Sequence, residues 1–123
     1  MILSNARDIS KERELLIFVY DAFNRRDIEP ILAVMHPELE WPNGMEGGWV
    51  HGREGVRTYW ARQWGMLDPH VKPIQFEGDC DGRIIVDVHQ VVRDLQGTVL
   101  MDRMVQHVYQ ICDRMILRMD IRE

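Results

Sequence analysis

The sequence lacks the cysteine content and the long apolar runs that would assign it to a secreted or membrane class. It has only two cysteines, Cys80 and Cys112, and their spacing fits neither a metal site nor a redox motif. They allow one structural disulfide or two buried free thiols, and we favour free thiols in a reducing cytosol. The N-terminal stretch MILSNARDISKERELL meets charge before an apolar run forms. We therefore expect no signal peptide, no membrane span and a cytoplasmic location.

A basic surplus is also missing. The chain has 15 basic and 20 acidic residues, for a formal net charge of −5. Because nucleic acids and anionic membranes both select basic surfaces, neither is an expected partner. The length of 123 residues, with 46% hydrophobic and 28% charged residues, suits one globular domain over residues 1–123. A chain of this size can bury a core without disulfides or metals.

The common local signatures of catalysis are absent as well. The five histidines show no H-x-H or H-x-x-x-H pair, so we expect no metal site. No serine or cysteine lies in a nucleophile motif. The glycine-rich start of NGMEGGWVHGREGVRTYWARQW, residues 43–64, lacks a G-K-[ST] ending and the spacing of a dinucleotide fingerprint. We expect Gly52 to supply a tight turn into a helix instead.

The first half of the chain has a helical period. Within residues 10–27, apolar side chains recur at three- and four-residue steps, which predicts a helix with one apolar face. A short helix over residues 28–35 and a strand at ELEW follow. A third helix is expected from Arg53. The apolar faces expected for the first and third helices are Leu15, Phe18, Val19, Ala22 and Phe23, and Val56, Tyr59, Trp60 and Trp64.

The second half changes to the period of strands. Residues 71–78, 83–94, 98–111 and 115–123 are rich in β-branched side chains and predict four strands. Asp81-Gly82 and Gln96-Gly97 are hairpin turn signals, whereas the turn at residues 112–114 lacks glycine. Helices followed by an antiparallel meander predict an α+β fold with N-terminal helices packed on one face of a sheet.

Alternation does not decide which face of the sheet meets the helices. One face of the second and third predicted strands carries Ile85, Asp87, His89, Val91, Leu100, Asp102, Met104, Gln106 and Val108. The other carries Ile84, Val86, Val88, Gln90, Met101, Arg103, Val105, His107 and Tyr109. Both faces are largely apolar, so we expect the helices to cover one and a partner subunit to cover the other.

Three segments carry a resemblance to a known family. FVYDAFNRRDIEPILAVMHPELEW, HGREGVRTYW and HVYQICDRMILRMDI resemble the nuclear transport factor 2-like (NTF2-like) superfamily, and most of all its SnoaL-like branch of polyketide cyclases and ketosteroid isomerase relatives. The likeness runs from about residue 12 to the C-terminus. It implies a curved, mainly antiparallel sheet around helices, a cystatin-like cone with an apolar pocket. It also implies a homodimer through the outer sheet face.

The resemblance implies that the steroid isomerase chemistry is not conserved here. Gln106 aligns with that enzyme's second pocket acid, Val19 with its oxyanion-hole tyrosine, and Asn43 or a neighbour with its catalytic base. All three residue types differ, so isomerisation by an aspartate base is not expected. Tyr20 is next to the tyrosine position, but one helical step turns it about 100° away.

The same alignment predicts the site residues. It turns six residues of the two central strands inward, together with Met119 and Ile121. The six are Asp87, His89, Asp102, Met104, Gln106 and Val108. His89 and Asp102 become cross-strand neighbours, and a histidine oriented by a carboxylate is a recognised general base. The same pair could instead be a structural hydrogen bond. The expected binding residues are Trp41, Asn43, Tyr59, Trp60, Asp87, Met104, Gln106, Val108 and Met119.

Two functions follow. The first is a cofactor-free isomerase, cyclase or dehydratase acting on a small, mostly apolar substrate, with His89 as base, Asp102 as its orienter, and Gln106 and Asn43 as donors. The second is a non-catalytic ligand-binding or assembly module with the same pocket. A homodimer is expected because the set taken as outward, Met101, Val105, His107 and Tyr109, is too apolar for a solvated face.

Overall fold

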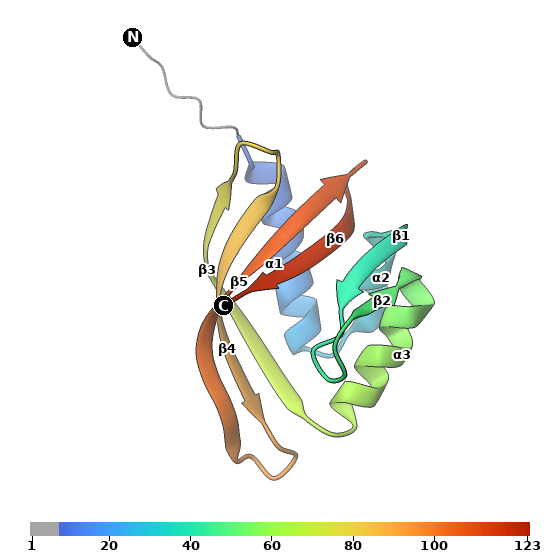
Figure 1. Cartoon of the computed structure of the whole chain (residues 1–123), viewed down its shortest axis with the longest axis vertical. Coiled ribbons are helices and arrows are strands. Elements are labelled where there is room, and N and C mark those ends of the chain that lie inside the picture. Colours follow the sequence, from blue (N-terminus) through green and yellow to red (C-terminus); the bar gives the residue numbers. More distant parts are fainter. Residues whose placement is uncertain (1–7) are drawn as a thin grey trace.

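Helices lead the chain and strands complete it in the computed structural model, which describes residues 8–123 (Figure 1). The order is α1 (Ser10–Asn24), α2 (Ile28–Ala33), β1 (Met35–Pro42), β2 (Trp49–His51), α3 (Gly52–Trp64), β3 (Asp68–Gly78), β4 (Ile84–Arg93), β5 (Val99–Cys112) and β6 (Met115–Arg122). The α+β class is confirmed. Residues 1–7 lie outside the described part, so the single domain over 1–123 and the absence of a signal peptide stay predictions.

The three predicted helices are present, but the buried face of α1 differs from the expected one. Leu16, Val19, Tyr20 and Ala22 are buried, while Phe18 is 41% exposed. The run LLIFVY is apolar almost all round, so its spacing does not fix which stripe meets the sheet. In α3, Val56, Tyr59 and Trp60 are buried as predicted.

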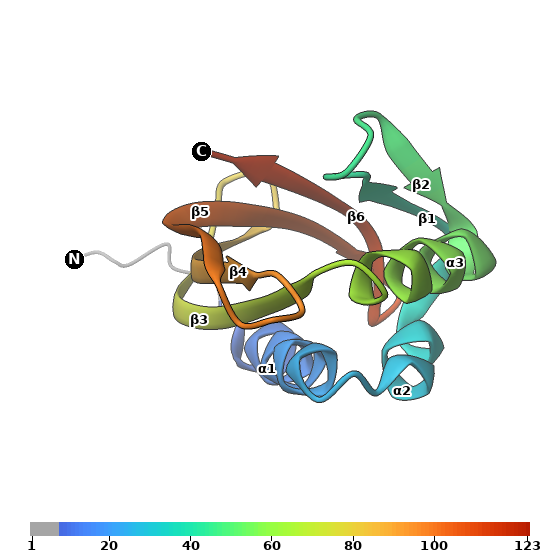
Figure 2. The ribbon, with the colours of Figure 1, turned by 90° about the horizontal axis from the view of Figure 1, so that it is seen from below.

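The six strands form one sheet in the order β2-β1-β6-β5-β4-β3. All neighbours are antiparallel except β1 and β6, which run parallel. Strand β2 was not predicted, because its three residues follow a glycine-rich segment. Register shifts interrupt the β1–β6, β3–β4, β4–β5 and β5–β6 ladders. Such bulges bend strands, and the sheet curves around α1 (Figure 2).

The face of the sheet that meets the helices is opposite to the predicted one. Val86 and Val88 of β4, and Val105 and Tyr109 of β5, are buried in the core with α1. The six residues expected inside lie on the other, convex face: Asp87, His89, Asp102, Met104, Gln106 and Val108. Because side chains alternate along a strand, an error of one residue in the alignment moves every side chain to the wrong face.

The turns follow the expected chemistry with one exception. Gly52, Gly82 and Gly97 have positive φ angles, so the predicted role of Gly52 in the turn into α3 is confirmed. The β5–β6 turn instead places Asp113 and Arg114 at φ of 54° and 64°, the left-handed region that favours glycine.

Neither cysteine is in a disulfide. Cys80 and Cys112 are both free and exposed, so the expectation that these thiols are buried is wrong. None of the helices in the described part of the chain is long and apolar enough to cross a membrane.

Candidate functional site

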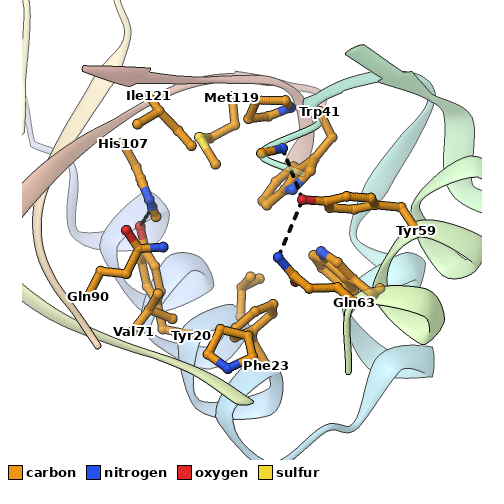
Figure 3. A pocket seen from close by; sticks show the side chains of 15 residues that line it. Tyr20, Phe23, Trp41, Tyr59, Gln63, Val71, Gln90, His107, Met119 and Ile121 are labelled. Atoms are coloured by element: carbon orange, nitrogen blue, oxygen red, sulfur yellow. Dashed lines mark hydrogen bonds between the residues drawn. The ribbon is translucent and has the colours of Figure 1, made fainter. Parts of the chain in front are cut away.

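A cavity of about 100 Å³ lies between the concave face of the sheet and the helices (Figure 3). Helices α1 and α3 form one side of it, and strands β3 to β6 form the other. The tip of β1 and the loop after it close one end. Its lining is mostly apolar or aromatic: Val19, Tyr20, Phe23, Trp41, Pro42, Gly44, Tyr59, Trp60, Gln63, Pro69, Val71, Gln90, His107, Met119 and Ile121.

Aromatic rings make the wall rigid. Trp41 meets Trp60 edge-on at a centroid distance of 5.5 Å, and Phe23 meets Trp60 in the same way at 5.2 Å. Trp64 lies behind Trp60, stacked at 5.6 Å, and does not itself line the cavity. Trp41, Tyr59, Trp60 and Met119 line the cavity, and their role in binding stays a prediction. The flat aromatic rings suit a flat apolar ligand.

Three buried polar side chains are linked by hydrogen bonds beside the cavity: Tyr109 and His107 from β5, and Tyr20 from α1. The Tyr109 hydroxyl donates to the Tyr20 oxygen at 2.9 Å, and Tyr20 lies 2.8 Å from Nδ1 of His107. Burial raises the pKa of both tyrosines above the ordinary range, so both hydroxyls keep their protons at neutral pH. Since Tyr20 already accepts from Tyr109, its own hydrogen is available to Nδ1.

Burial and the contact with Tyr20 together fix the protonation state and the tautomer of His107. Burial lowers its pKa from 6.5 to about 4, so the ring is neutral at neutral pH. A neutral imidazole carries one hydrogen, and Nδ1 must stay bare to accept from Tyr20. The hydrogen therefore lies on Nε2, for which the described residues offer no hydrogen-bond partner. His107 thus presents an N–H donor to a cavity that it lines.

A second polar group lies on the helix side. The Tyr59 hydroxyl receives hydrogen bonds from the backbone N–H of Gly44 at 3.0 Å and from Nε2 of Gln63 at 3.4 Å. Burial raises the pKa of this hydroxyl too. Gln90 adds its amide to the lining from β4.

The predicted pair of His89 and Asp102 forms, but in another place. Nε2 of His89 lies 2.6 Å from Oδ1 of Asp102, as expected for cross-strand neighbours. Both side chains are exposed on the convex face, at 40% and 59%. The expectation that they face the cavity is wrong, because Val88 and Gln90 occupy the inward positions on either side of His89. A general base must reach its proton, so the structure gives this pair no role at the cavity.

Five predicted binding residues also lie outside the cavity. Asp87 accepts a hydrogen bond from Nε2 of Gln106 at 2.8 Å on the convex face, where Met104 is 54% exposed. Val108 is buried but points to that same face, near Arg118 and Asp120. The Asn43 oxygen accepts from the N–H groups of residues 45 and 46, so it holds the loop in a turn.

The residues that sequence reasoning missed are the polar ones that line the cavity. Tyr20, Gln90 and His107 each stand one position from a residue given a role or an inward orientation, namely Val19, His89 and Gln106. Tyr109 was taken as outward and is fully buried. One signal in the sequence could have found them. His107 and Tyr109 lie on the same face of one strand, and if that face is buried both side chains need a hydrogen-bond partner, which Tyr20 provides.

Carboxylates are absent from the lining of this cavity within residues 8–123. In the same part of the chain, no three His, Cys, Asp or Glu side chains come together so that they could hold a metal ion.

Comparison with known proteins adds a family match. A model of the SnoaL-like domain matches residues 18–119. The crystal structure of TerC with polyporic acid is 31% identical to this chain, with a TM-score of 0.78 and coverage of 91% of this chain and 90% of TerC. An NTF2-like protein of unknown function from Burkholderia pseudomallei is 24% identical, with a TM-score of 0.78 over 91% of this chain and 89% of its own.

A third solved structure shares the fold at lower identity. A candidate polyketide cyclase from Sinorhizobium meliloti is 17% identical, with a TM-score of 0.73 over 89% of this chain and 94% of its own. No curated protein matches the chain.

Proposed function

We propose that this chain, which belongs to the SnoaL-like domain family, binds a small and mostly apolar carbonyl compound in the aromatic cavity. The observation that carries the proposal is the Nε2–H of His107, a neutral donor without a partner in the described residues, at the edge of an apolar cavity. An apolar ligand that covered this N–H without pairing it would cost about 1–3 kcal/mol, and a carbonyl oxygen on the ligand removes that cost.

The same geometry supports proton-transfer chemistry. A neutral imidazole that donates to a carbonyl stabilises the negative charge that develops on oxygen when a neighbouring C–H is deprotonated. Tyr20 and Tyr109 hold the ring in the donating tautomer. Enolisation of this kind is the first step of isomerisation, of aldol-type cyclisation and of some dehydrations, and the proposed role of His107 uses only the chain's own side chains.

One observation favours the second candidate, a binding module without turnover. No carboxylate lines the cavity within residues 8–123, and the low pKa of His107 makes it a weak base. The proton acceptor in a catalysed reaction would then be water or the substrate itself. Binding is thus the part of the proposal that the geometry supports best.

Binding can be tested with 4-isopropylacetophenone, a flat apolar ketone with one oxygen. Calorimetric titration of the unmodified protein should give measurable affinity, and His107→Phe should weaken it about tenfold. TerC was crystallised with polyporic acid, which makes that compound a second probe. His89→Gln on the convex face serves as the control and should bind as the parent does. Equal affinities for the parent and His107→Phe would contradict the proposal.

Turnover can be separated from binding with the same ketone. In D₂O, a chain that stabilises the enolate should speed exchange of the acetyl hydrogens for deuterium, which NMR follows directly. His107→Phe should remove that acceleration. A protein that binds the ketone but leaves its exchange rate unchanged is the non-catalytic module.

We also propose that the convex face of the sheet pairs with a second copy of the chain. The support is different from the expected one, since Val105, His107 and Tyr109 are buried inside. The convex face instead exposes Met104, next to the half-buried Val91. The two free, exposed thiols support a reducing, cytoplasmic location.

A further inference from the structure

The Tyr59 hydroxyl holds a hydrogen that the structure does not use. Its oxygen accepts from the Gly44 N–H at 3.0 Å and from the Gln63 amide at 3.4 Å. Both contacts occupy lone pairs and leave the O–H hydrogen to point elsewhere. Within residues 8–123, no acceptor receives that hydrogen. Because Tyr59 is only 9% exposed and lines the cavity, the hydrogen is directed to the cavity rather than to bulk water.

Local structure sets the direction of this hydroxyl. A side chain at Gly44 would place its Cβ 3.5 Å from the Tyr59 oxygen, so the loop backbone passes directly over the ring's polar end. Asn43 fixes that loop through its two backbone hydrogen bonds. The hydroxyl oxygen is therefore held from two sides, by the loop backbone at Gly44 and by the Gln63 amide of α3.

The two unused donors stand on opposite walls. His107 reaches the cavity from β5, and Tyr59 reaches it from α3, with Trp41 and Met119 along the side between them (Figure 3). The rest of the lining is mostly apolar, so a ligand between the donors would meet polar groups at its two ends and rings along its length.

We infer that the cavity selects a flat, uncharged ligand with a hydrogen-bond-accepting oxygen at each of two opposite ends, one for His107 Nε2–H and one for Tyr59 O–H. The inference rests on the proposed function, because it takes the His107 contact as the first of the two. It adds the second contact and so narrows the ligand class from carbonyl compounds to diketones and related compounds with two acceptors.

The charge of the lining excludes the obvious alternative of a dicarboxylate. No Lys or Arg is among the lining residues within the described chain, and both donors are neutral. A carboxylate between them would lose its hydration without gaining a counter-charge, which is strongly unfavourable. Neutral carbonyl oxygens match neutral donors without that cost.

The test compares two ketones of nearly equal shape. 1,4-Diacetylbenzene differs from 4-isopropylacetophenone mainly by an oxygen in place of a methyl group at the second end. Calorimetric titration of the unmodified protein should give about tenfold tighter binding of the diketone. Tyr59→Phe should abolish this preference, so that the variant binds the diketone and the monoketone with affinities within about twofold of each other. Thermal melting checks that the variant is folded.

The outcomes separate this inference from the proposed function. His107→Phe should weaken both ketones by a similar factor and keep the preference for the diketone, whereas Tyr59→Phe should remove that preference. Equal affinity of the unmodified protein for the two ketones overturns the two-oxygen inference and leaves the proposed function standing, even if Tyr59→Phe does not fold. A preference that survives Tyr59→Phe also overturns it. If neither ketone binds, both proposals are wrong.

Discussion

His107 is the residue whose burial has the widest consequences. Its side chain is 6% exposed, and burial holds its pKa near 4 instead of 6.5. Between pH 4 and pH 6.5, His107 is therefore protonated in the unfolded chain and neutral in the folded chain. In that window stability falls as the pH falls, and the contribution of His107 is fully present only above pH 6.5.

We expect this to be visible in urea unfolding. Between pH 7 and pH 4 the parent should lose about 3 kcal/mol of unfolding free energy through His107 alone. Carboxylates also titrate in this range, so the quantity to measure is the difference from His107→Phe, whose curve should be flatter by about that amount. Curves that run parallel would show that His107 is not buried in its neutral form.

Individual residues were the least predictable level. Gln106 and His107 are adjacent on β5, yet one faces solvent and the other lines the cavity. Nothing in the strand's alternation distinguishes them, because Val105, Tyr109, Met104 and Val108 make both faces apolar. Trp41 of β1 and Tyr59 and Trp60 of α3 escaped this ambiguity in part because large aromatic rings are usually buried wherever they lie.

Asn24 connects the end of α1 to the edge strand β3. Its side chain donates to the Val71 carbonyl at 2.7 Å and accepts from the Val71 N–H at 3.0 Å. The end of α1 thereby satisfies the backbone of β3 where that strand has no neighbour on its outer side. Val71 lines the cavity, so this contact also sets the position of one wall.

Replacing Asn24 should loosen that edge. Asn24→Ala leaves a donor and an acceptor of Val71 unpaired, and we expect a loss of about 1–3 kcal/mol in unfolding free energy. Asn24→Asp keeps the acceptor and removes only the donor, so its loss should be smaller. Urea denaturation of both variants measures this. A change of less than about 0.5 kcal/mol for Asn24→Ala would argue that water replaces the side chain easily.

The β5–β6 turn places a non-glycine residue in a backbone conformation that favours glycine. Arg114 adopts a left-handed conformation that disfavours any side chain with a Cβ. Arg114→Gly should therefore raise the unfolding free energy by about 0.5–1 kcal/mol, after the greater freedom of glycine in the unfolded chain is allowed for. Arg114→Ala tests the cause, since it removes the charge but keeps the Cβ and should give no gain. A loss on Arg114→Gly would point to a role for the guanidinium instead.

Elements were predictable where period and turn chemistry agreed. The strands from β3 to β6 lie within a few residues of their predicted bounds, because β-branched runs and the Gly82 and Gly97 turns mark them. Strand β2 was missed because it is short and its pairing with β1 comes from tertiary structure. Which stripe of α1 is buried was missed because the helix is apolar on most sides.

At the scale of the whole molecule, the convex face of the sheet is the surface proposed to pair with a second copy. It carries the His89–Asp102 pair beside Met104, with charged groups of β6 at its other end. If two copies pair through it, light scattering at micromolar concentration should give twice the monomer mass. Met104→Lys should shift the mass to the monomer without changing ketone binding, because Met104 does not line the cavity. A monomeric parent at that concentration would contradict the proposed dimer.

The general shape of the molecule was predictable from the sequence, since the change from a helical to an alternating period fixes the α+β class and the family resemblance implies the curvature. The contents of the cavity were not, because they depend on which face of two apolar strands turns inward.

The most direct test of the central claim is nitrogen-15 NMR of the histidine rings with 4-isopropylacetophenone. We predict that His107 is neutral at pH 6.5, carries its hydrogen on Nε2, and shows a changed Nε2–H signal when the ketone binds. A charged His107 ring at that pH, or an unchanged signal under saturating ketone, would contradict it.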